Sequence, residues 1–257
     1  MNQPFRIVIP ARYASSRLPG KPLRTLHGRP MIRYVYETAC QSGASDVIVA
    51  TDDDRIRTAV EAFGATVCMT SPDHPSGTDR LAEVVDTLGW PDDTIIVNLQ
   101  GDEPLMPAAL VRQVAANLAV HAGVRIATLA TPIESIDEFF DPNVVKVVCD
   151  KAGYALYFSR APVPWDRDAC TGGRQSLPAE MPALRHIGLY AYRASFLWEF
   201  RHLKPASVEN TEKLEQLRAL WHGDRIHTGI AEEHPGHGVD TEDQLEIVEQ
   251  LLEKRAQ

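Results

Sequence analysis

Cysteine is scarce in this 257-residue sequence, and its four cysteines, at positions 40, 68, 149 and 170, stand far apart. Because no Cys-x-x-Cys pair occurs, the spacing favours neither a zinc site nor a disulfide framework. Unpaired cysteines are typical of a reducing compartment. The first residues also lack the pattern of a secretory signal peptide. We therefore expect a cytoplasmic protein.

Long apolar runs and an excess of positive charge are missing as well. No stretch is long and apolar enough to cross a bilayer. The 26 basic residues are outnumbered by 35 acidic ones, and the net charge of −9 repels nucleic acids and anionic membrane surfaces. We expect neither of these partners. A polyanionic small molecule must therefore be met by a local cluster of basic residues.

Several functional motifs are also absent. Neither the P-loop pattern Gly-x-x-x-x-Gly-Lys-Ser/Thr nor the dinucleotide pattern Gly-x-Gly-x-x-Gly follows a predicted strand. This argues against a P-loop ATPase and a nicotinamide dehydrogenase. Covalent catalysis lacks support too, because the sequence has no Gly-x-Ser-x-Gly motif and no obvious nucleophilic cysteine.

What the first half does contain is an alternation of short β-branched runs with segments of helical period. Strands are predicted at residues 6–10, 46–51, 66–69 and 94–99, and helices at residues 30–42, 53–63, 77–88 and 107–121. This order predicts parallel strands joined by right-handed crossovers, with helices on both faces of the sheet. Ligands bind at the carboxyl ends of such strands, so the loops that follow them are expected to converge on one cleft.

The second half is less regular. Strands are predicted at 126–131, 144–149, 154–159 and 187–192, and helices from 194 and 209 onward. The stretch 165–182 is rich in glycine, proline and polar residues, and it is a candidate lid or interface loop. We predict one α/β domain over residues 1–257 with a smaller inserted subdomain at about 126–205.

The loop after the first strand carries most of the local positive charge. Arg12, Arg17, Lys21 and Arg24 lie in a short connection that three prolines stiffen and Gly20 opens to close backbone approach. Arginine forks and a lysine point charge together suit a ligand with several phosphates. The alternative is a solvated basic surface turn.

Two aspartates are candidate magnesium ligands. Asp102 follows an apolar strand in Gln-Gly-Asp-Glu-Pro, and Asp240 precedes the last predicted helix. Magnesium needs only one or two protein carboxylates when phosphate oxygens complete its shell. The alternatives are a capped turn for Asp102 and a helix N-cap for Asp240. The neighbouring His234 and His237 are not on a helical face, and we do not interpret them as metal ligands.

Eight segments in a fixed order resemble the bacterial CMP-Kdo synthetases, the cytidylyltransferases that activate 3-deoxy-manno-octulosonate (Kdo) for lipopolysaccharide assembly. The segments cover nearly the whole chain. They are IPARYASSRLPGKPL (9–23), ATDD (50–53), SGTDR (76–80), NLQGDEP (98–104), ALYFSR (155–160), RHIGLY (185–190), LEQLR (214–218) and GVD (238–240).

The resemblance implies a GT-A-like, three-layer nucleotidyltransferase fold, a homodimer, and transfer of CMP from CTP to Kdo with release of pyrophosphate. Catalytic roles are implied for Arg12, Lys21 and Asp102. The implied magnesium ligands are Asp102 and Asp240. The implied nucleotide-binding residues are Ala11, Arg12, Arg17, Lys21, Asp52, Ser76, Gly77 and Arg80. The implied sugar-binding residues are Gln100, Arg167, His186, Tyr190, Glu215 and Gln216.

Alternative functions stay open at this point. A related synthetase acting on sialic acid or on 8-amino-Kdo would keep the reaction and change the acid. A GT-A glycosyltransferase would also use an aspartate-bound metal, but it would release a nucleoside diphosphate instead of pyrophosphate. A non-catalytic nucleotide-binding module would leave the sugar-side residues without a role.

Overall fold

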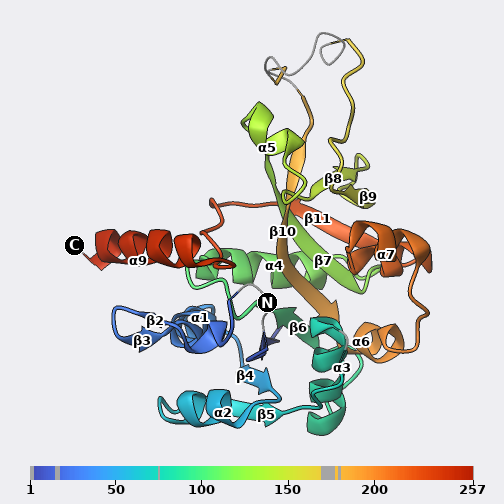
Figure 1. Ribbon diagram of the computed structural model, residues 1–257. Coiled ribbons are helices and arrows are strands. Elements are labelled where there is room, and N and C mark those ends of the chain that lie inside the picture. The colour runs from blue at the N-terminus through green and yellow to red at the C-terminus, as the bar shows by residue number, and fades with distance from the viewer. Residues whose placement is uncertain (1–2, 15–17, 75, 169–176, 179–180, 257) are drawn as a thin grey trace.

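The computed structural model describes residues 3–14, 18–74, 76–168, 177–178 and 181–256. Within these residues a nine-stranded sheet forms the centre of the molecule, and β2 and β3 make a separate hairpin (Figure 1). The strands are β1 (Phe5–Ala11), β2 (Thr25–Leu26), β3 (Arg29–Pro30), β4 (Asp46–Thr51), β5 (Thr66–Met69), β6 (Ile95–Asn98), β7 (Ile126–Pro132), β8 (Lys146–Cys149), β9 (Ala155–Ser159), β10 (Leu184–Arg193) and β11 (Ile226–Ile230). The main path through the sheet is β11-β7-β10-β6-β1-β4-β5.

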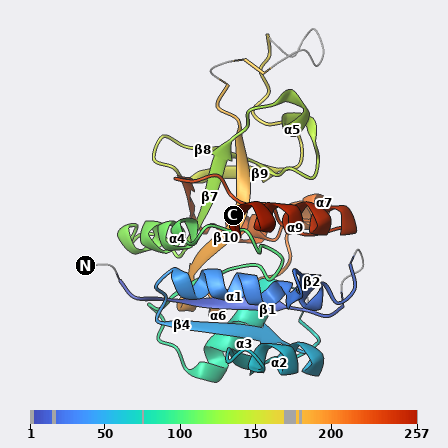
Figure 2. The same cartoon turned by 90° about the vertical axis from the view of Figure 1, so that its left-hand side faces the viewer.

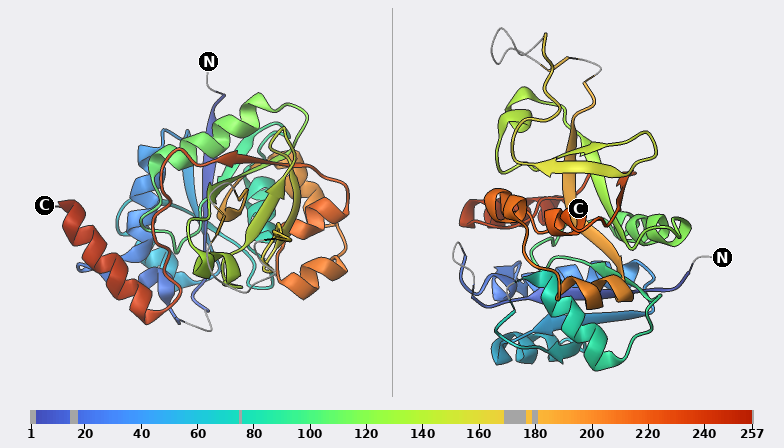
Figure 3. Two further views of the ribbon diagram at one scale, coloured as in Figure 1. Left: turned by 90° about the horizontal axis from the view of Figure 1, so that it is seen from above. Right: turned by 90° about the vertical axis from the view of Figure 1, so that its right-hand side faces the viewer.

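Helices cover both faces of this sheet. They are α1 (Met31–Gln41), α2 (Asp54–Glu61), α3 (Gly77–Leu88), α4 (Ala108–Val120), α5 (Ile136–Phe140), α6 (Ala194–Phe200), α7 (Ser207–Glu212), α8 (Gln216–Trp221) and α9 (Glu242–Ala256), with the 3-10 helix η1 (Lys21–Leu23). Ile7 and Ile9 of β1 pack with α1 and α4, whereas Val8 packs with α3 and α6 on the opposite face. The ribbon shows α1 and α4 on one side of β1 and α3 on the other (Figures 2 and 3). Successive side chains of a strand point to opposite faces, so β1 is apolar throughout. The predicted three-layer α/β fold is confirmed.

One strand on the main path through the sheet departs from the predicted parallel arrangement. β10 lies between β6 and β7 and runs antiparallel to both, whereas β6, β1, β4 and β5 are mutually parallel. β10 is also longer than the predicted 187–192, and its pairing with β7 shifts register between Ile187 and Tyr190. Because β10 runs in the opposite direction, Tyr190 lies opposite Asn98 at the carboxyl end of β6, and the earlier residues of β10 extend past that end. β11 escapes sequence prediction because its five residues, with a histidine and a glycine inside, show no clear period.

The chain between β7 and β10 projects away from the main sheet. It forms α5, the β8–β9 hairpin and an arm that extends beyond them (Figure 1). A small apolar cluster around Ile133, Phe139 and Ala183 packs at its base. β7 and β10, at the ends of the predicted subdomain 126–205, belong to the main sheet, and the division into two parts stays a prediction. Much of the predicted lid or interface loop, 169–176 and 179–180, lies outside the described residues.

The segment after β11 returns to the loop that follows β6. Val239 donates its backbone N–H to the Asp102 carbonyl oxygen at 2.9 Å. A Cβ atom at Gly236 would lie 2.3 Å from the carbonyl oxygen of Leu105, so only glycine allows this approach. α9 then packs Leu245 into a cluster with Leu105 and Val239. No helix in the described part of the chain is long and apolar enough to span a membrane.

The buried histidine of β11 predicts a dependence of stability on pH. His227 is 8% exposed and stacks on His121, and burial together with that neighbour lowers the pKa of His227 to about 4. The unfolded chain therefore takes up this proton near pH 6.5, before the folded protein does, and acidification favours unfolding. Between pH 6.5 and pH 4, wild type should lose about 2 to 3 kcal/mol more unfolding free energy than His227→Phe, measured by urea unfolding. The control is substitution of the exposed His202 by Asn, and equal pH slopes for wild type and His227→Phe would contradict the prediction.

Candidate active site

Loops that follow neighbouring strands meet at one edge of the sheet. The loop after β1 carries Arg12 and Lys21, the one after β4 carries Asp52, and the one after β6 carries Asp102. β1 is parallel to both neighbours, so all these loops leave the same edge. The convergence predicted from the strand order is confirmed.

Lys21 joins two carboxylates from distant parts of the chain. Its Nζ donates to Asp102 Oδ2 at 2.6 Å and to Asp240 Oδ1 at 2.9 Å. Burial by itself would lower the pKa of Lys21, but the two carboxylates outweigh burial and raise it. The ammonium group therefore stays charged and holds the two aspartates on one side of the site.

The donor set of this aspartate pair fits magnesium. Both residues offer carboxylate oxygens, which are the ligands that magnesium prefers. In the part of the chain that the structure describes, no group of three or more His, Cys, Asp or Glu side chains is arranged to hold a metal. Magnesium takes one or two protein carboxylates and completes its shell with water and phosphate oxygens. Asp102 and Asp240 therefore fit an ion that binds together with a phosphorylated ligand.

The two aspartates line a cavity of about 430 Å³, which we call the carboxylate cavity. Its wall also holds Glu103, whose pKa is raised to about 8 by burial and by the neighbouring charges of Asp102 and Asp240. A Cβ atom at Gly238 would lie 2.7 Å from Glu103 Oε1, so the glycine leaves room for this carboxyl group. Arg185 and His237 also line the carboxylate cavity.

Arg12 ties the basic loop to the start of α3. Its Nη2 donates to the carbonyl oxygens of His74 at 2.7 Å and Ser76 at 3.0 Å. Ser76 in turn caps α3, because its Oγ accepts the N–H of Asp79 at 3.2 Å. The loop after β1 and the amino end of α3 are thereby held together, as a nucleotide site built from both would require.

Arg80 lies fully buried beneath this junction. It forms an ion pair with Asp52, with Nη1 and Oδ1 3.3 Å apart, and it donates to Thr70 Oγ1. Burial lowers the pKa of Arg80 more than Asp52 raises it. The Nε and Nη2 atoms of Arg80 are buried without a hydrogen-bond partner among the described residues. Buried donors are seldom left unpaired, so these atoms favour a ligand that supplies acceptors.

A second cavity, of about 370 Å³, lies beside α3, β10 and α8, and we call it the tyrosine cavity. It is lined by most of the predicted sugar-binding residues and by the predicted nucleotide residue Gly77. The sugar-binding residues among them are Gln100, His186, Tyr190, Glu215 and Gln216. His186 and Gly188 also line the carboxylate cavity, so the two cavities adjoin.

The tyrosine cavity is weakly charged. Burial lowers the pKa of His186 to about 3, which keeps its imidazole neutral at pH 7. Burial also raises the pKa of Glu215. The side-chain oxygen of Asn98 is buried without a hydrogen-bond partner among the described residues. The amides of Asn98, Gln100 and Gln216 and the neutral imidazole of His186 thus offer uncharged donors and acceptors, which suit the hydroxyl groups of a sugar.

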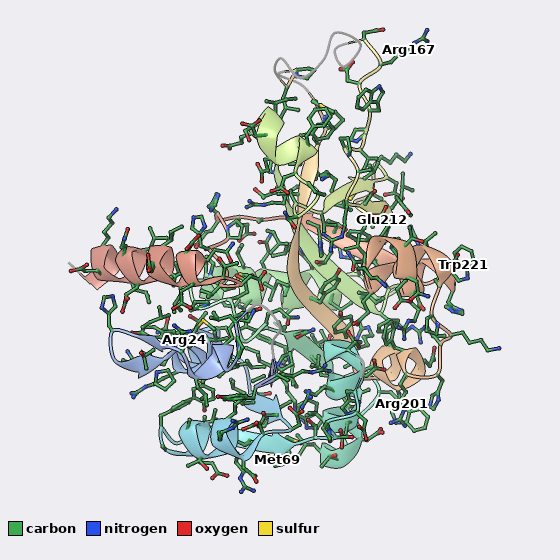
Figure 4. The ribbon with its side chains drawn as sticks, viewed as in Figure 1. Arg24, Met69, Arg167, Arg201, Glu212 and Trp221 are labelled. Carbon is green, nitrogen blue, oxygen red and sulfur yellow. The ribbon has the colours of Figure 1, made fainter. Side chains whose placement is uncertain are left out.

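Two anchors, one buried and one half-buried, fix the segment that carries Glu215. The guanidinium of Arg218 donates to Glu209 through Nε at 2.9 and 3.1 Å and through Nη2, and both residues are 8% exposed. Glu212 accepts from Ser159 Oγ at 2.7 Å and from the backbone of Arg160 at 2.9 Å, at the position labelled in Figure 4. The segment between these anchors is thereby fixed against β9.

Two of the predicted basic residues, Arg24 and Arg167, take no part in the contacts described so far. Arg167 is exposed in the projecting arm and lines neither cavity (Figure 4). Arg24 pairs with Glu242 of α9, and Arg17 lies outside the described residues. The remaining predicted residue, Ala11, is buried at the end of β1.

Sequence reasoning missed Glu103, Arg185 and the anchor formed by Glu209 and Arg218. Glu103 and Arg185 sit inside segments that carried the resemblance, and their neighbours Asp102 and His186 were chosen instead. Glu209 and Arg218 lie on different helices, and no local pattern shows that they are paired. Only the fold brings these side chains to the site.

The contribution of the Glu209–Arg218 pair to stability can be tested by removing one partner. Arg218→Met should lower the unfolding free energy by about 3 kcal/mol, because the Glu209 carboxylate would be left buried without its partner. The double variant Glu209→Leu with Arg218→Met should lose less than this single one. Chemical denaturation of the two single variants and the double variant measures the coupling. Strictly additive losses would show that the pair does not act as a unit.

Comparisons with known proteins agree with this geometry. A family model described as cytidylyltransferase matches residues 6–226. The 3-deoxy-manno-octulosonate cytidylyltransferase of Vibrio parahaemolyticus is 56% identical over 252 residues, which are 98% of this chain and 99% of the relative. The enzyme of the same name from Pseudomonas fluorescens is 58% identical over 253 residues, 98% of this chain and all of the relative.

Solved structures show the same relationship. The structure of CMP:2-keto-3-deoxy-manno-octonic acid synthetase complexed with CTP has a TM-score of 0.89 and 43% identity, over 98% of this chain and 100% of that one. A cytidylyltransferase from Leptospira borgpetersenii, 15% identical with a TM-score of 0.61 over 98% of this chain and 88% of that one, shares the fold. With 56 to 58% identity to these curated relatives over almost its full length, the chain belongs to the cytidylyltransferase family and, within it, to the 3-deoxy-manno-octulosonate cytidylyltransferases.

Proposed function

We propose that this chain transfers CMP from CTP to 3-deoxy-manno-octulosonate and releases pyrophosphate. The relatives named for this activity align with the chain over nearly their full length. The structural observation that carries the proposal is the bridge from Lys21 to Asp102 and Asp240, beside the tyrosine cavity with its amide, imidazole and phenol groups. The bridge suits a triphosphate and its metal, and the cavity suits a sugar.

In the proposed reaction, the anomeric hydroxyl oxygen of Kdo attacks the α-phosphorus of CTP. A new oxygen–phosphorus bond forms while the bond from the α-phosphorus to pyrophosphate breaks, and the proton of the hydroxyl group is released to solvent. Arg12 and Lys21 place positive charge beside the triphosphate, and Arg80 offers unpaired donors to the nucleotide. Gln100 and His186 position the sugar. The contribution of these groups is orientation and charge neutralisation, which dominate catalysis of phosphoryl transfer.

Magnesium is the proposed cofactor, held by Asp102 and Asp240. When bound, it supplies Lewis-acid neutralisation of phosphate oxygens and lowers the pKa of a coordinated hydroxyl group. Lys21 keeps both carboxylates at the same wall of the site. Glu103 lies next to them with a raised pKa, so it adds less negative charge at neutral pH than an ordinary glutamate would.

The reaction predicts pyrophosphate release when CTP, Kdo and magnesium are mixed with the protein. Asp102→Asn should lower turnover by about 1,000-fold or more while the protein stays folded, because a charged ligand is lost. Coupled pyrophosphate detection gives the rate, and circular dichroism reports folding. Asp243→Asn, in the exposed first turn of α9, is the matched control and should keep wild-type turnover.

The same assay separates the other functions. Faster turnover of sialic acid than of Kdo would identify sialic acid as the substrate. Release of a nucleoside diphosphate would indicate a glycosyltransferase. Near-normal turnover by the folded Asp102→Asn variant would contradict the metal site.

We also propose that the chain is a cytoplasmic homodimer that serves lipopolysaccharide assembly. Support for the dimer comes from β9, which pairs only with β8 among the described strands and exposes Leu156 and Tyr157. Exposed apolar side chains on an edge strand favour association. Leu156→Asp should shift the protein from dimer to monomer in sedimentation velocity. A wild-type protein that is monomeric at micromolar concentration would contradict this proposal.

A further inference from the structure

The tyrosine cavity does not provide a counter-charge for an acid. Among the described residues that line it, no side chain is a lysine or an arginine. The pKa of His186 is lowered to about 3, so its imidazole is uncharged at neutral pH. Glu215 is itself an acid. A carboxylate buried there would lose its hydration without gaining a cation, which is costly. The acid group of the substrate must therefore reach beyond this cavity.

Arg185 is the cation at the place where the two cavities adjoin. It precedes His186, which lines both cavities, and it is the single lysine or arginine among the described residues that line the carboxylate cavity. It lines this cavity together with Glu103, Asp102 and Asp240, so its positive charge faces the acidic groups of the cavity wall. The other charged groups there are carboxylates, and two of them already share Lys21.

A carboxylate from outside the cavity holds Arg185 in position. Arg185 Nη1 lies 2.9 Å from Glu138 Oε1. Glu138 is fixed in turn, because its backbone N–H donates to the capping hydroxyl of Ser135 at 3.1 Å. Glu138 does not line the carboxylate cavity. One ion pair does not exhaust the five donors of a guanidinium group. Arg185 is thus oriented from behind while it retains donors for a ligand.

The arginine predicted from sequence for this purpose lies far from both cavities. Arg167 is exposed near the outer end of the projecting arm (Figure 4). Arg185, in contrast, lies on β10 and lines the carboxylate cavity. Within one chain, Arg185 is therefore the arginine placed to meet an acid whose hydroxyl groups occupy the tyrosine cavity.

We propose that Arg185 binds the carboxylate of the sugar acid and makes the enzyme select an acid over a neutral sugar. The proposal rests on the proposed function, since it concerns the acid substrate of that site. The guanidinium group would donate charge-assisted hydrogen bonds to the carboxylate oxygens. The hydroxyl groups of the sugar would lie against Gln100, His186 and Gln216. Carboxylate and hydroxyl groups are then recognised by separate walls.

The test compares Kdo with its primary carboxamide, which has the same hydroxyl groups without the negative charge. Both compounds are titrated calorimetrically into wild type, Arg185→Met and Arg185→Lys, and the KM values for Kdo and CTP are measured. Arg185→Met should weaken Kdo binding by about 10- to 100-fold and leave carboxamide binding nearly unchanged. Arg185→Lys should recover part of the loss, because it keeps the charge without the fork. The KM for CTP should stay within about twofold of wild type.

Two control variants make the outcomes distinct. Arg112→Met removes an arginine from α4, away from both cavities, and should change neither binding nor turnover. Glu138→Gln keeps the cation and loosens its support, so it should weaken Kdo binding less than Arg185→Met does. If Arg185→Met is unstable, Arg185→Lys and Glu138→Gln still report the preference for acid over carboxamide.

Equal weakening of Kdo and carboxamide binding would reduce Arg185 to a structural role and overturn the proposal. An unchanged preference together with a raised KM for CTP would assign Arg185 to the triphosphate and would also overturn it. In either case, wild-type turnover of CTP and Kdo leaves the proposed function standing. If wild type neither binds nor converts Kdo, the proposed function fails as well.

Discussion

The contact of Lys21 with both Asp102 and Asp240 is the interaction on which the rest of the site depends. It joins the loop after β1 to the loop after β6 and to the segment before α9. Two carboxylates so close together would repel each other without a cation. The contact also requires close backbone approach, which the hydrogen bond from Val239 to Asp102 and the glycine at position 236 permit. Backbone packing and charge pairing therefore support the same geometry.

β10 connects this charged centre to the neutral cavity. Because it runs antiparallel to β6, its early residues lie at the edge where the parallel strands end. Arg185 and His186 stand at the shared wall, and Tyr190 lies farther along in the tyrosine cavity. The strand thus presents a cation, a neutral imidazole and a phenol in succession. That sequence of chemical groups matches a substrate with an acid at one end and hydroxyl groups beyond it.

The buried pair of Glu209 and Arg218 shows how stability and function are coupled here. Neither residue lines the tyrosine cavity or the carboxylate cavity, yet the pair fixes the short segment that carries Glu215 and Gln216. Burying an ion pair is costly unless its hydrogen bonds are complete, as they are in this bidentate arrangement. The site is therefore held by three kinds of contact. These are the bridge from Lys21 to the two aspartates, the close backbone approach at Gly236, and the buried pair of Glu209 and Arg218.

The sequence alone determined the α/β class, the order of β1, β4 and β6 with their helices, and the convergence of their loops. Apolar periodicity and strand order are local properties, so they can be read without coordinates. The resemblance added the roles proposed for Lys21, Asp102 and the cavity residues. Only the tertiary structure decided the reversed direction of β10, the contact between Lys21 and Asp240, and the different positions of Arg167 and Arg185. These depend on pairing between residues far apart in the chain, and no local pattern encodes which distant partner a strand or side chain will meet.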